Sequence, residues 1–337
     1  MKDNKKLGFT LSYDFITPDL SHDLIQILDD SPFTHVFVPE VWGYDALLEC
    51  ARMADHAEKL IFGTGIINIY SRSPATMEQA AASIFEQTDG RFVLGLGLSG
   101  PNVIENWHGI PYYESSPMQR TREYLEIIRL ILSGEEVNYS GEIFKLKGFK
   151  LRTFDTPVRV PLYLAAFGKR NTQLAGELAD GWLPIWTSFP ELSEVRENFQ
   201  EGQSKRSKNL DPNVEISPYL VTCASEDVEQ AKFLVKRQLV HYIGGMGTFY
   251  ARIVKKYGFA NEVDRIRKKW QNGQKKLAID EVTDEMLSRL AVVGSPEEVL
   301  TRYEILRKKG VTLPVVWLPF NCPPPLALET INTFIEA

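Results

Sequence analysis

Glu40 and His108 are the two side chains of this sequence whose type and position best suit proton transfer. Glu40 ends the apolar run 34–40, and His108 lies downstream of the apolar run 91–100. A carboxyl group or an imidazole at the end of a buried strand could exchange a proton or a hydrogen bond with a bound ring. Each also has a structural interpretation, Glu40 as a helix cap or salt-bridge partner at the rim and His108 as a satisfied structural group.

The other histidines and the cysteines do not suggest a metal centre. The histidines lie in expected helices or at strand starts, and none has a spacing typical of metal ligands. The cysteines are far apart and form no CxxC pair, which argues against structural zinc and against a disulfide framework. We therefore expect no metal and a reducing compartment. The residues are His22, His35, His56, His241, Cys50, Cys223 and Cys322.

Gly95, Gly97 and Gly100 form a GxGxxG pattern at the end of the run 91–100. A dinucleotide-binding fold would need a helix that starts at the last glycine and an acidic residue after the next strand. Here Pro101 follows, and we expect a loop. The pattern therefore favours one wall of a pocket, in which the first two glycines let a helix or a ligand approach the strand. The expected loop carries Asn102, Glu105, Trp107 and His108.

Two further stretches could contact a ligand through their backbone. Gly63 and Gly65 interrupt a β-branched run at 60–69, which suggests a bulge or a planar ligand, although they could equally ease barrel packing. The residues 168–171, Gly-Lys-Arg-Asn, precede a helix that we expect to begin near Thr172. Backbone N–H groups, the helix dipole and two cations would together hold a phosphate group, and a solvated basic turn is the alternative.

All these candidates follow short apolar runs that are typical of buried strands. Segments with helical spacing alternate with the runs, and the runs are almost continuously hydrophobic, as in parallel sheets covered on both faces. Eight such units predict an α/β fold of the closed (β/α)8 TIM-barrel type, with ligands at the carboxyl ends of the strands. The runs are 7–13, 34–40, 60–69, 91–100, 161–168, 181–188, 214–224 and 313–320.

The spacing between the runs is uneven in two places. Between the seventh and eighth runs the chain is far longer than one crossover helix needs, so we expect a helical insertion at about 225–290 over the upper rim. A shorter excursion at 135–160 has the alternation of a hairpin. Neither resembles a linker, so we expect one domain over 1–337.

The composition excludes several kinds of partner. The 337 residues include 44 acidic and 38 basic side chains, a formal net charge of -6, so no overall positive field attracts nucleic acid or an anionic membrane. No run approaches the roughly 20 apolar residues of a membrane-spanning helix, and the first residues lack an export signal. We expect a soluble, cytoplasmic protein that acts on a small molecule.

Three long stretches together resemble the bacterial-luciferase-like superfamily of barrel oxidoreductases, and the resemblance covers nearly the whole chain. Within that superfamily the sequence is most similar to the branch that uses the deazaflavin coenzyme F420, such as methylenetetrahydromethanopterin reductase. The resemblance implies F420 as cofactor, with FMN as the alternative, and a homodimer. The stretches are GTGIINIYSRSPATMEQAAASIFEQTDGRFVLGLGLSGPNVIENWHG (63–109), REYLEIIR (122–129) and PLYLAAFGKRNTQLAGELADGWLPIW (161–186).

The resemblance also implies roles for single residues. A bulge with a non-proline cis peptide supports the deazaflavin ring in that branch, and the matching bond is Gly65–Ile66. The acidic residue near the ring is matched by Glu40, but Val41 replaces the histidine that follows it in some relatives. This difference argues against an aldehyde or sugar-alcohol substrate.

Backbone amides of the fifth strand's loop hold the cofactor phosphate in that branch. The matching residues run from Phe167 through Gly168, Lys169 and Arg170 to Asn171, and Gly-Lys replaces the commoner Gly-Pro. The extra lysine would suit a more anionic tail. Elsewhere in the pocket, Trp42 and Trp107 would form walls, and Asn68 and Ser99 would bond the polar tail or the ring edge.

The leading hypothesis is an F420-dependent oxidoreductase that transfers hydride between the deazaflavin C5 and an imine, enone or carbonyl compound. Glu40 and His108 would be its proton donors. An FMN-dependent monooxygenase of the same superfamily is the alternative. A barrel that binds a cofactor without catalysis is a third hypothesis, from a different class.

Overall fold

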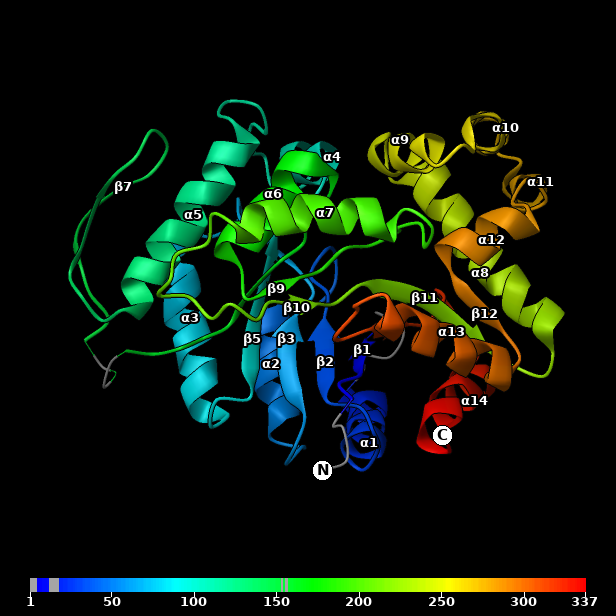
Figure 1. Ribbon diagram of the computed structural model, residues 1–337, viewed down its shortest axis with the longest axis horizontal. Coiled ribbons are helices and arrows are strands. Elements are labelled where there is room, and N and C mark those ends of the chain that lie inside the picture. Colours follow the sequence, from blue (N-terminus) through cyan, green and yellow to red (C-terminus); the bar gives the residue numbers. More distant parts are fainter. Residues whose placement is uncertain (1–4, 12–17, 153, 155–156) are drawn as a thin grey trace.

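The strands of the protein form a closed ring of parallel β-structure in the computed structural model, which describes residues 5–11, 18–152, 154 and 157–337 (Figure 1). Around the ring the order is β1, β2, β3, β5, β8, β9, β10 with β11, and β13. The bounds are β1 Gly8–Thr10, β2 His35–Val38, β3 Ile61–Thr64, β5 Phe92–Gly97, β8 Leu162–Leu164, β9 Gly181–Trp182, β10 Glu215–Ile216, β11 Tyr219–Ala224 and β13 Val315–Trp317.

The seventh apolar run closes the ring by pairing in two steps. Its first part, β10, pairs with β9 through Ile216 and Trp182, and its second part, β11, pairs with β13 through Tyr219 and Val315. Val315 also pairs with Gly8 of β1, which completes the circle. The predicted eight-stranded barrel is confirmed. The last two residues of the expected first strand, 12–13, lie outside the described residues.

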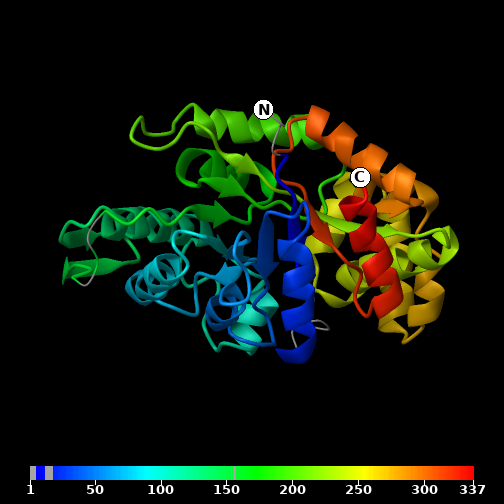
Figure 2. The ribbon, with the colours of Figure 1, turned by 90° about the horizontal axis from the view of Figure 1, so that it is seen from below.

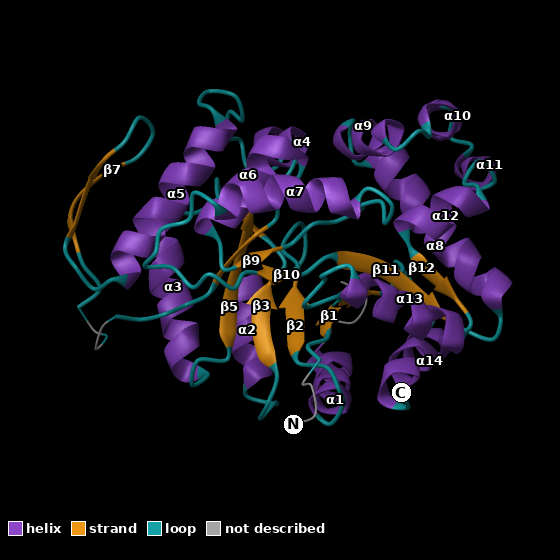
Figure 3. Ribbon diagram, viewed as in Figure 1, coloured by secondary structure: helices purple, strands orange, loops and turns teal. Residues whose placement is uncertain are grey.

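Helices cover the outside of the ring (Figure 3). They are α1 Pro18–Asp29, α2 Ala46–Ala54, α3 Pro74–Gln87, α4 Pro101–Asn106, α5 Pro117–Leu132, α6 Gly168–Leu178, α7 Leu192–Gln203, α13 Pro296–Lys308 and α14 Pro324–Ile335. Three of them begin at a Ser-Pro pair, in which the serine hydroxyl accepts a backbone N–H of the first turn and proline fits the first helical position. The capping serines are Ser73, Ser116 and Ser295.

Side chains fill the inside of the barrel, so it is a packed core and not a pore. The cluster comprises Phe37, Val93, Tyr163, Leu183, Leu313 and Val315, all buried. Gly63 belongs to this layer, because a Cβ at that position would lie 2.5 Å from Val93 Cγ2. Of the two interpretations of Gly63, the structure therefore supports barrel packing.

The expected insertion between the seventh and eighth strands is present. It comprises α8 Val228–Gly245, α9 Phe249–Lys256, α10 Ala260–Gln271, α11 Lys275–Ile279 and α12 Asp284–Leu290. The structure adds a strand that the sequence did not predict, β12 (Val292–Gly294), which pairs in parallel with Thr222–Ala224 of β11. Three residues between two helices are too few to show a strand pattern. That the chain forms one domain remains a prediction.

The expected hairpin is also present, as β6 (Val137–Ser140) and β7 (Lys145–Phe149). It extends from the flank of the barrel opposite α13 and α14 (Figure 2). Glu123 of α5 holds its turn by accepting the backbone N–H groups of Glu142, Ile143 and Phe144.

Two sequence expectations about helix positions were wrong. The stretch after Gly100, expected to be a loop, begins with the six-residue helix α4. Pro101 occupies a first helical position, where proline is favoured, so it starts this helix. The helix expected near Thr172 begins earlier, at Gly168. In the described part of the chain, no helix is long and apolar enough to cross a membrane.

Candidate functional site at the carboxyl ends of the strands

The carboxyl ends of the strands remain accessible although the barrel below them is filled. Val93 and Leu183 in the interior layer are fully or almost fully buried. One layer closer to the carboxyl ends, several apolar side chains keep part of their surface accessible, namely Ile66, Ala165, Phe167, Ile185 and Tyr219. The arrows of β2 and β3 point toward the top of Figure 1, where α4 and α6 lie. The accessible layer is where this fold places ligands.

The third strand breaks into two pieces at the predicted bulge. β3 ends at Thr64, the peptide bond between Gly65 and Ile66 is cis, and pairing with β5 resumes in β4 (Ile67–Asn68). The cis bond that the resemblance implied is therefore present. Gly95 of β5 lies against this turn: its N–H donates to the Thr64 hydroxyl at 2.9 Å, and a Cβ on Gly95 would lie 1.9 Å from the Thr64 carbonyl oxygen.

This contact corrects the interpretation of the glycine pattern in β5. The sequence suggested that Gly95 and Gly97 let a helix or a ligand approach. Instead, Gly95 admits the backbone of β3, and a Cβ on Gly97 would lie 2.9 Å from the Ile66 side chain. The two glycines make room for the neighbouring strand and its bulge.

The carboxylate of Glu40 is engaged on both oxygens. Arg72, which follows β4, donates to Oε1 at 2.6 Å and to Oε2 at 3.0 Å, and the backbone N–H of Ala46 donates to Oε2 at 3.1 Å. Arg72 also pairs with Asp45, the N-cap of α2, at 2.5 Å. The hydrogen bond with Glu40 raises the pKa of Arg72. This geometry matches the capping and salt-bridge interpretation of Glu40.

His108 lies exposed just after α4, and its Nε2 is 3.4 Å from Asn68 Nδ2. Asn68 is buried, and its Oδ1 accepts the backbone N–H groups of Tyr70 and Ser71. The amide of Asn68 is thus fixed in orientation, with its nitrogen toward the imidazole. The structure brings these two candidates together, one from the third strand and one from the loop after the fourth.

Trp42 and Trp107 also meet. Their ring centroids are 5.7 Å apart at an angle of 69°, and both rings are about half exposed. They join the loops that follow the second and fourth strands. Ser99, at the end of β5, is half-buried and has φ +61°, a left-handed backbone conformation that is uncommon for residues other than glycine.

The start of α6 is open to a ligand. Phe167 is its N-cap residue and provides no capping hydrogen bond, so within the described part of the chain the N-cap side chain leaves the first backbone N–H groups of the helix unbonded. Gly168 has φ +70°, and a Cβ on it would meet no atom within 4 Å. Lys169 and Arg170 are exposed, and Lys169 lies 3.5 Å from Glu201. Asn171 Oδ1 is buried and has no hydrogen-bond partner among the described residues.

Sequence reasoning missed Arg72 and Tyr219. The ring of Tyr219 keeps some accessible surface, while its hydroxyl is buried without a hydrogen-bond partner in the described part of the chain. Thr10 lies beside it but donates its own hydroxyl to the Phe37 carbonyl at 3.2 Å. Burial raises the pKa of Tyr219. Its hydroxyl lies directly against Gly65, since a Cβ there would be 1.9 Å away.

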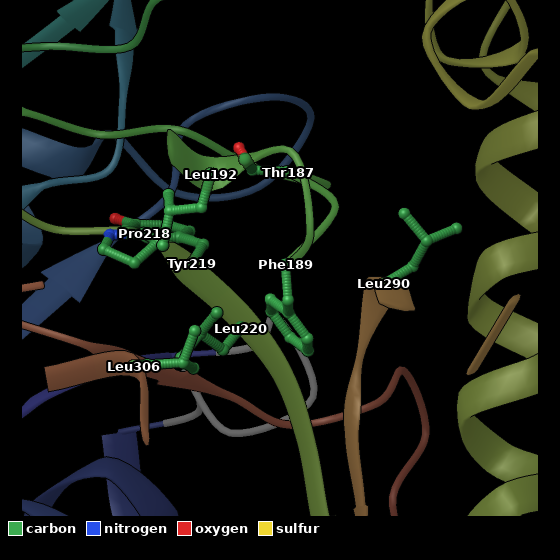
Figure 4. Close-up of a pocket in the computed structure, with 8 residues that line it drawn as sticks. All are labelled: Thr187, Phe189, Leu192, Pro218, Tyr219, Leu220, Leu290 and Leu306. Carbon is green, nitrogen blue, oxygen red and sulfur yellow. The ribbon is translucent and has the colours of Figure 1, made fainter. Parts of the chain in front are cut away.

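A small hollow lies on the outer side of the seventh strand (Figure 4). Its lining is apolar apart from Thr187 and comprises Thr187, Phe189, Leu192, Pro218, Tyr219, Leu220, Leu290 and Leu306. Its volume, about 10 Å³, is at most that of a single water site. It is too small for a substrate. No group of three or more His, Cys, Asp or Glu side chains suited to a metal ion occurs among the described residues.

Comparison with known proteins gives consistent results. Residues 16–313 match the family model described as luciferase-like monooxygenase. A Mycobacterium tuberculosis protein whose name assigns it to the coenzyme F420-dependent oxidoreductases is 31% identical, over 94% of this chain and 96% of its own. The 5,10-methylenetetrahydromethanopterin reductase of Archaeoglobus fulgidus is also 31% identical, over 88% and 89%.

Solved structures support the same fold. The coenzyme F420-dependent tetrahydromethanopterin reductase of Methanopyrus kandleri has a TM-score of 0.85, at 21% identity and with 98% of each chain covered. A diketocamphane monooxygenase of Pseudomonas putida in complex with FMN has a TM-score of 0.72, at 16% identity, over 98% of this chain and 97% of its own. The barrel, its bulge and the family match agree, and the chain belongs to the luciferase-like monooxygenase family.

Proposed function

We propose that the protein is a coenzyme F420-dependent oxidoreductase that transfers hydride between C5 of the deazaflavin and a small organic substrate of the imine, enone or carbonyl type. One relative at 31% identity is named as a coenzyme F420-dependent oxidoreductase and the other as a methylenetetrahydromethanopterin reductase, whereas the FMN complex is a structural neighbour at 16% identity. The family includes both cofactors, so the cofactor must be argued from the site itself.

The observation that carries the proposal is the open start of α6. Its backbone N–H groups lack a capping side chain, Gly168 leaves space above them, and Lys169 and Arg170 add positive charge. A phosphate group fits such a helix start, because the dipole and the free N–H groups both favour an anion. F420 carries its phosphate next to an anionic tail, for which the two cations are suited.

The chain's own residues would position the reaction. When bound, F420 supplies the carbon that gives or takes the hydride. The start of α6 would hold the phosphate, the Gly65–Ile66 turn and Asn68 would line the ring, and Trp42 would limit access of water. Ser99, in its left-handed conformation, would present its hydroxyl to the tail or ring edge.

His108 is the candidate that remains free to move a proton. It is exposed, and its contact with the fixed amide of Asn68 orients the imidazole at the rim. Glu40 has a different role in this proposal, because its bidentate pair with Arg72 is the arrangement of an ionised carboxylate. We propose that Glu40 positions the loop that carries Trp42 and that His108 exchanges the proton.

Titration of the purified protein with F420, followed by the fluorescence of the cofactor, tests the proposal. The double variant K169A/R170A should raise the Kd for F420 about tenfold or more, a loss of about 1.4 kcal/mol of binding free energy. Lys147, exposed on the distant hairpin, provides the matched control K147A, which should leave the Kd unchanged. A protein that binds no F420 would refute the assignment.

Two further measurements separate the alternatives. Heating the purified protein and recording the absorption of the released cofactor distinguishes FMN from the blue-shifted deazaflavin. H108A should lower kcat with little effect on the Kd for F420, because a proton-transfer group acts mainly in the transition state. Bound cofactor without turnover on any imine, enone or carbonyl compound would favour the non-catalytic barrel. The expected homodimer can be tested by light scattering.

A further inference from the structure

A continuous series of aromatic rings crosses from the eighth strand to the fifth over the carboxyl ends of the barrel. We call it the aromatic arc and define it, in spatial order, as Trp317, Trp186, Tyr242, Tyr250, Phe249 and Phe167. Successive ring centroids are 5.6, 5.2, 4.8, 5.4 and 5.7 Å apart, within the range of favourable aromatic contacts. The insertion helices α8 and α9 thus reach the start of α6 through aromatic contacts.

The arc has an accessible face. Trp186 and Trp317 are 2% and 6% exposed and form its base, whereas Phe249 is 39% exposed. Tyr242, Tyr250 and Phe167 keep intermediate accessibility. Part of the surface of these rings is therefore open to contact with a ligand.

Two arginines beside the arc are bonded to backbone carbonyl groups, and the neighbouring histidine is uncharged. Arg237 donates to the carbonyl oxygens of Phe320 and Asn321, and Arg267 donates to the carbonyl oxygen of Ile243 at 3.0 Å. His241 is in edge contact with Tyr242, and burial, followed by the charge of Lys275, lowers its pKa, so it is neutral at neutral pH. Arg237 and Arg267 are thus bonded to the backbone, and Lys169 and Arg170, which follow Phe167, would face the cofactor phosphate in the proposed function.

Two polar atoms at the base of the arc are buried without a partner in the described residues, the Trp186 indole nitrogen and the Tyr219 hydroxyl. Tyr219 adjoins the arc, with its ring centroid 6.4 Å from that of Trp317. Trp186 also has φ +53°, a backbone conformation that is an outlier for a bulky residue and is concentrated at functional sites.

We propose that the aromatic arc selects a planar, uncharged, conjugated substrate, an aromatic ketone or enone, which stacks on its rings. The inference rests on the proposed function, since the cofactor at the start of α6 would share the accessible layer with this substrate. Reduction would add one hydride from the cofactor and one proton from His108, which regains it from solvent, across a single C=C or C=O bond, while the reduced cofactor is oxidised.

The test compares three probes by quenching of tryptophan fluorescence, with and without F420. Benzylideneacetone is planar and neutral, trans-cinnamate has nearly the same skeleton with a carboxylate, and glucose 6-phosphate is anionic and not planar. The proposal expects benzylideneacetone to bind at least tenfold more tightly than either anion. Y242A should weaken it at least fivefold and leave the Kd for F420 unchanged. Y113A, at a 71% exposed ring outside the arc, is the matched control and should change neither value.

Each outcome decides the proposal. Equal or tighter binding of cinnamate or glucose 6-phosphate overturns it, as does F420 binding without any binding of benzylideneacetone. Benzylideneacetone binding without F420 binding supports the arc and refutes the proposed cofactor, so the two failures are distinguishable. If Y242A does not fold, F249A replaces it, because Phe249 loses less buried surface.

Discussion

The contact between Gly65 and Tyr219 allows a sharp test of how the bulge of the third strand is accommodated. In G65A the new Cβ would lie 1.9 Å from the Tyr219 hydroxyl oxygen and 3.0 Å from Phe37 Cβ. Favourable contact between carbon atoms requires about 3.5 Å, so the phenol would have to move within a filled barrel. Overpacking of this kind typically costs about 1–3 kcal/mol. Gly65 has no positive φ, so space, and not backbone conformation, excludes a side chain.

Removal of the hydroxyl should relieve the clash. In Y219F the nearest remaining atom of the ring, Cζ, would lie 3.1 Å from the Cβ of Ala at position 65, a tight but tolerable distance. Y219F alone should be close to neutral or stabilising, because it removes a buried hydroxyl that lacks a partner within the described residues. The double variant should therefore be more stable than the sum of the single changes predicts, by roughly 1–2 kcal/mol.

Urea unfolding of the four proteins measures this coupling from the midpoints, provided that the m-values stay constant. G100A is the matched control, because Gly100 has φ -93° and a Cβ there would meet no atom within 4 Å. It should be tolerated in both backgrounds. Additive effects of G65A and Y219F, within about 0.5 kcal/mol, would refute the reasoning. If G65A alone does not fold, recovery of folding in the double variant gives the same information.

Three further predictions concern stability. Burial, followed by the charge of Lys6, lowers the pKa of His35 from 6.5 to about 4. Between these two pH values the unfolded chain binds more protons than the folded protein. The free energy of unfolding should therefore fall by about 3 kcal/mol as the pH drops from 6.5 to 4. Urea midpoints measured from pH 7 to 4 check this, and H35F should flatten the curve. Burial raises the pKa of Glu78, and its carboxyl oxygens have no partner among the described residues. The wild-type protein should therefore lose stability as the pH rises above about 4.5, and E78Q should be more stable than the wild type at neutral pH. Equal stability-versus-pH profiles for the two proteins would contradict this. In G202A the new Cβ would lie 1.9 Å from the Gln173 carbonyl oxygen, which should push α7 away from α6. The free energy of unfolding should fall by on the order of 3 kcal/mol, as measured by thermal unfolding. An unchanged melting temperature would show that the two helices can shift without loss of stability.

Some parts of the fold could be predicted because their signal is local. Continuous apolar runs identify buried strands, and Ser-Pro pairs such as the one at Ser73 fix where helices begin, since each depends on neighbours in the sequence. The three-residue strand β12 carries no such signal, and the start of α6 was placed four residues late because Gly168 is also a common loop residue.

Some features of the candidate site could likewise be predicted from the sequence, and others could not. The sequence by itself predicted the barrel and the insertion, suggested the bulge near Gly65, and led to the anion site proposed at 168–171, because strand ends and helix starts follow from patterns along the chain. Only the tertiary structure decided that Glu40 is held by Arg72, 32 residues away, and that the Tyr219 hydroxyl lies against Gly65. Periodicity shows which face of an element is buried, but it does not show which distant side chain packs there. For Glu40 and His108, that difference separates the positioning role that we propose for the first from the proton transfer that we propose for the second.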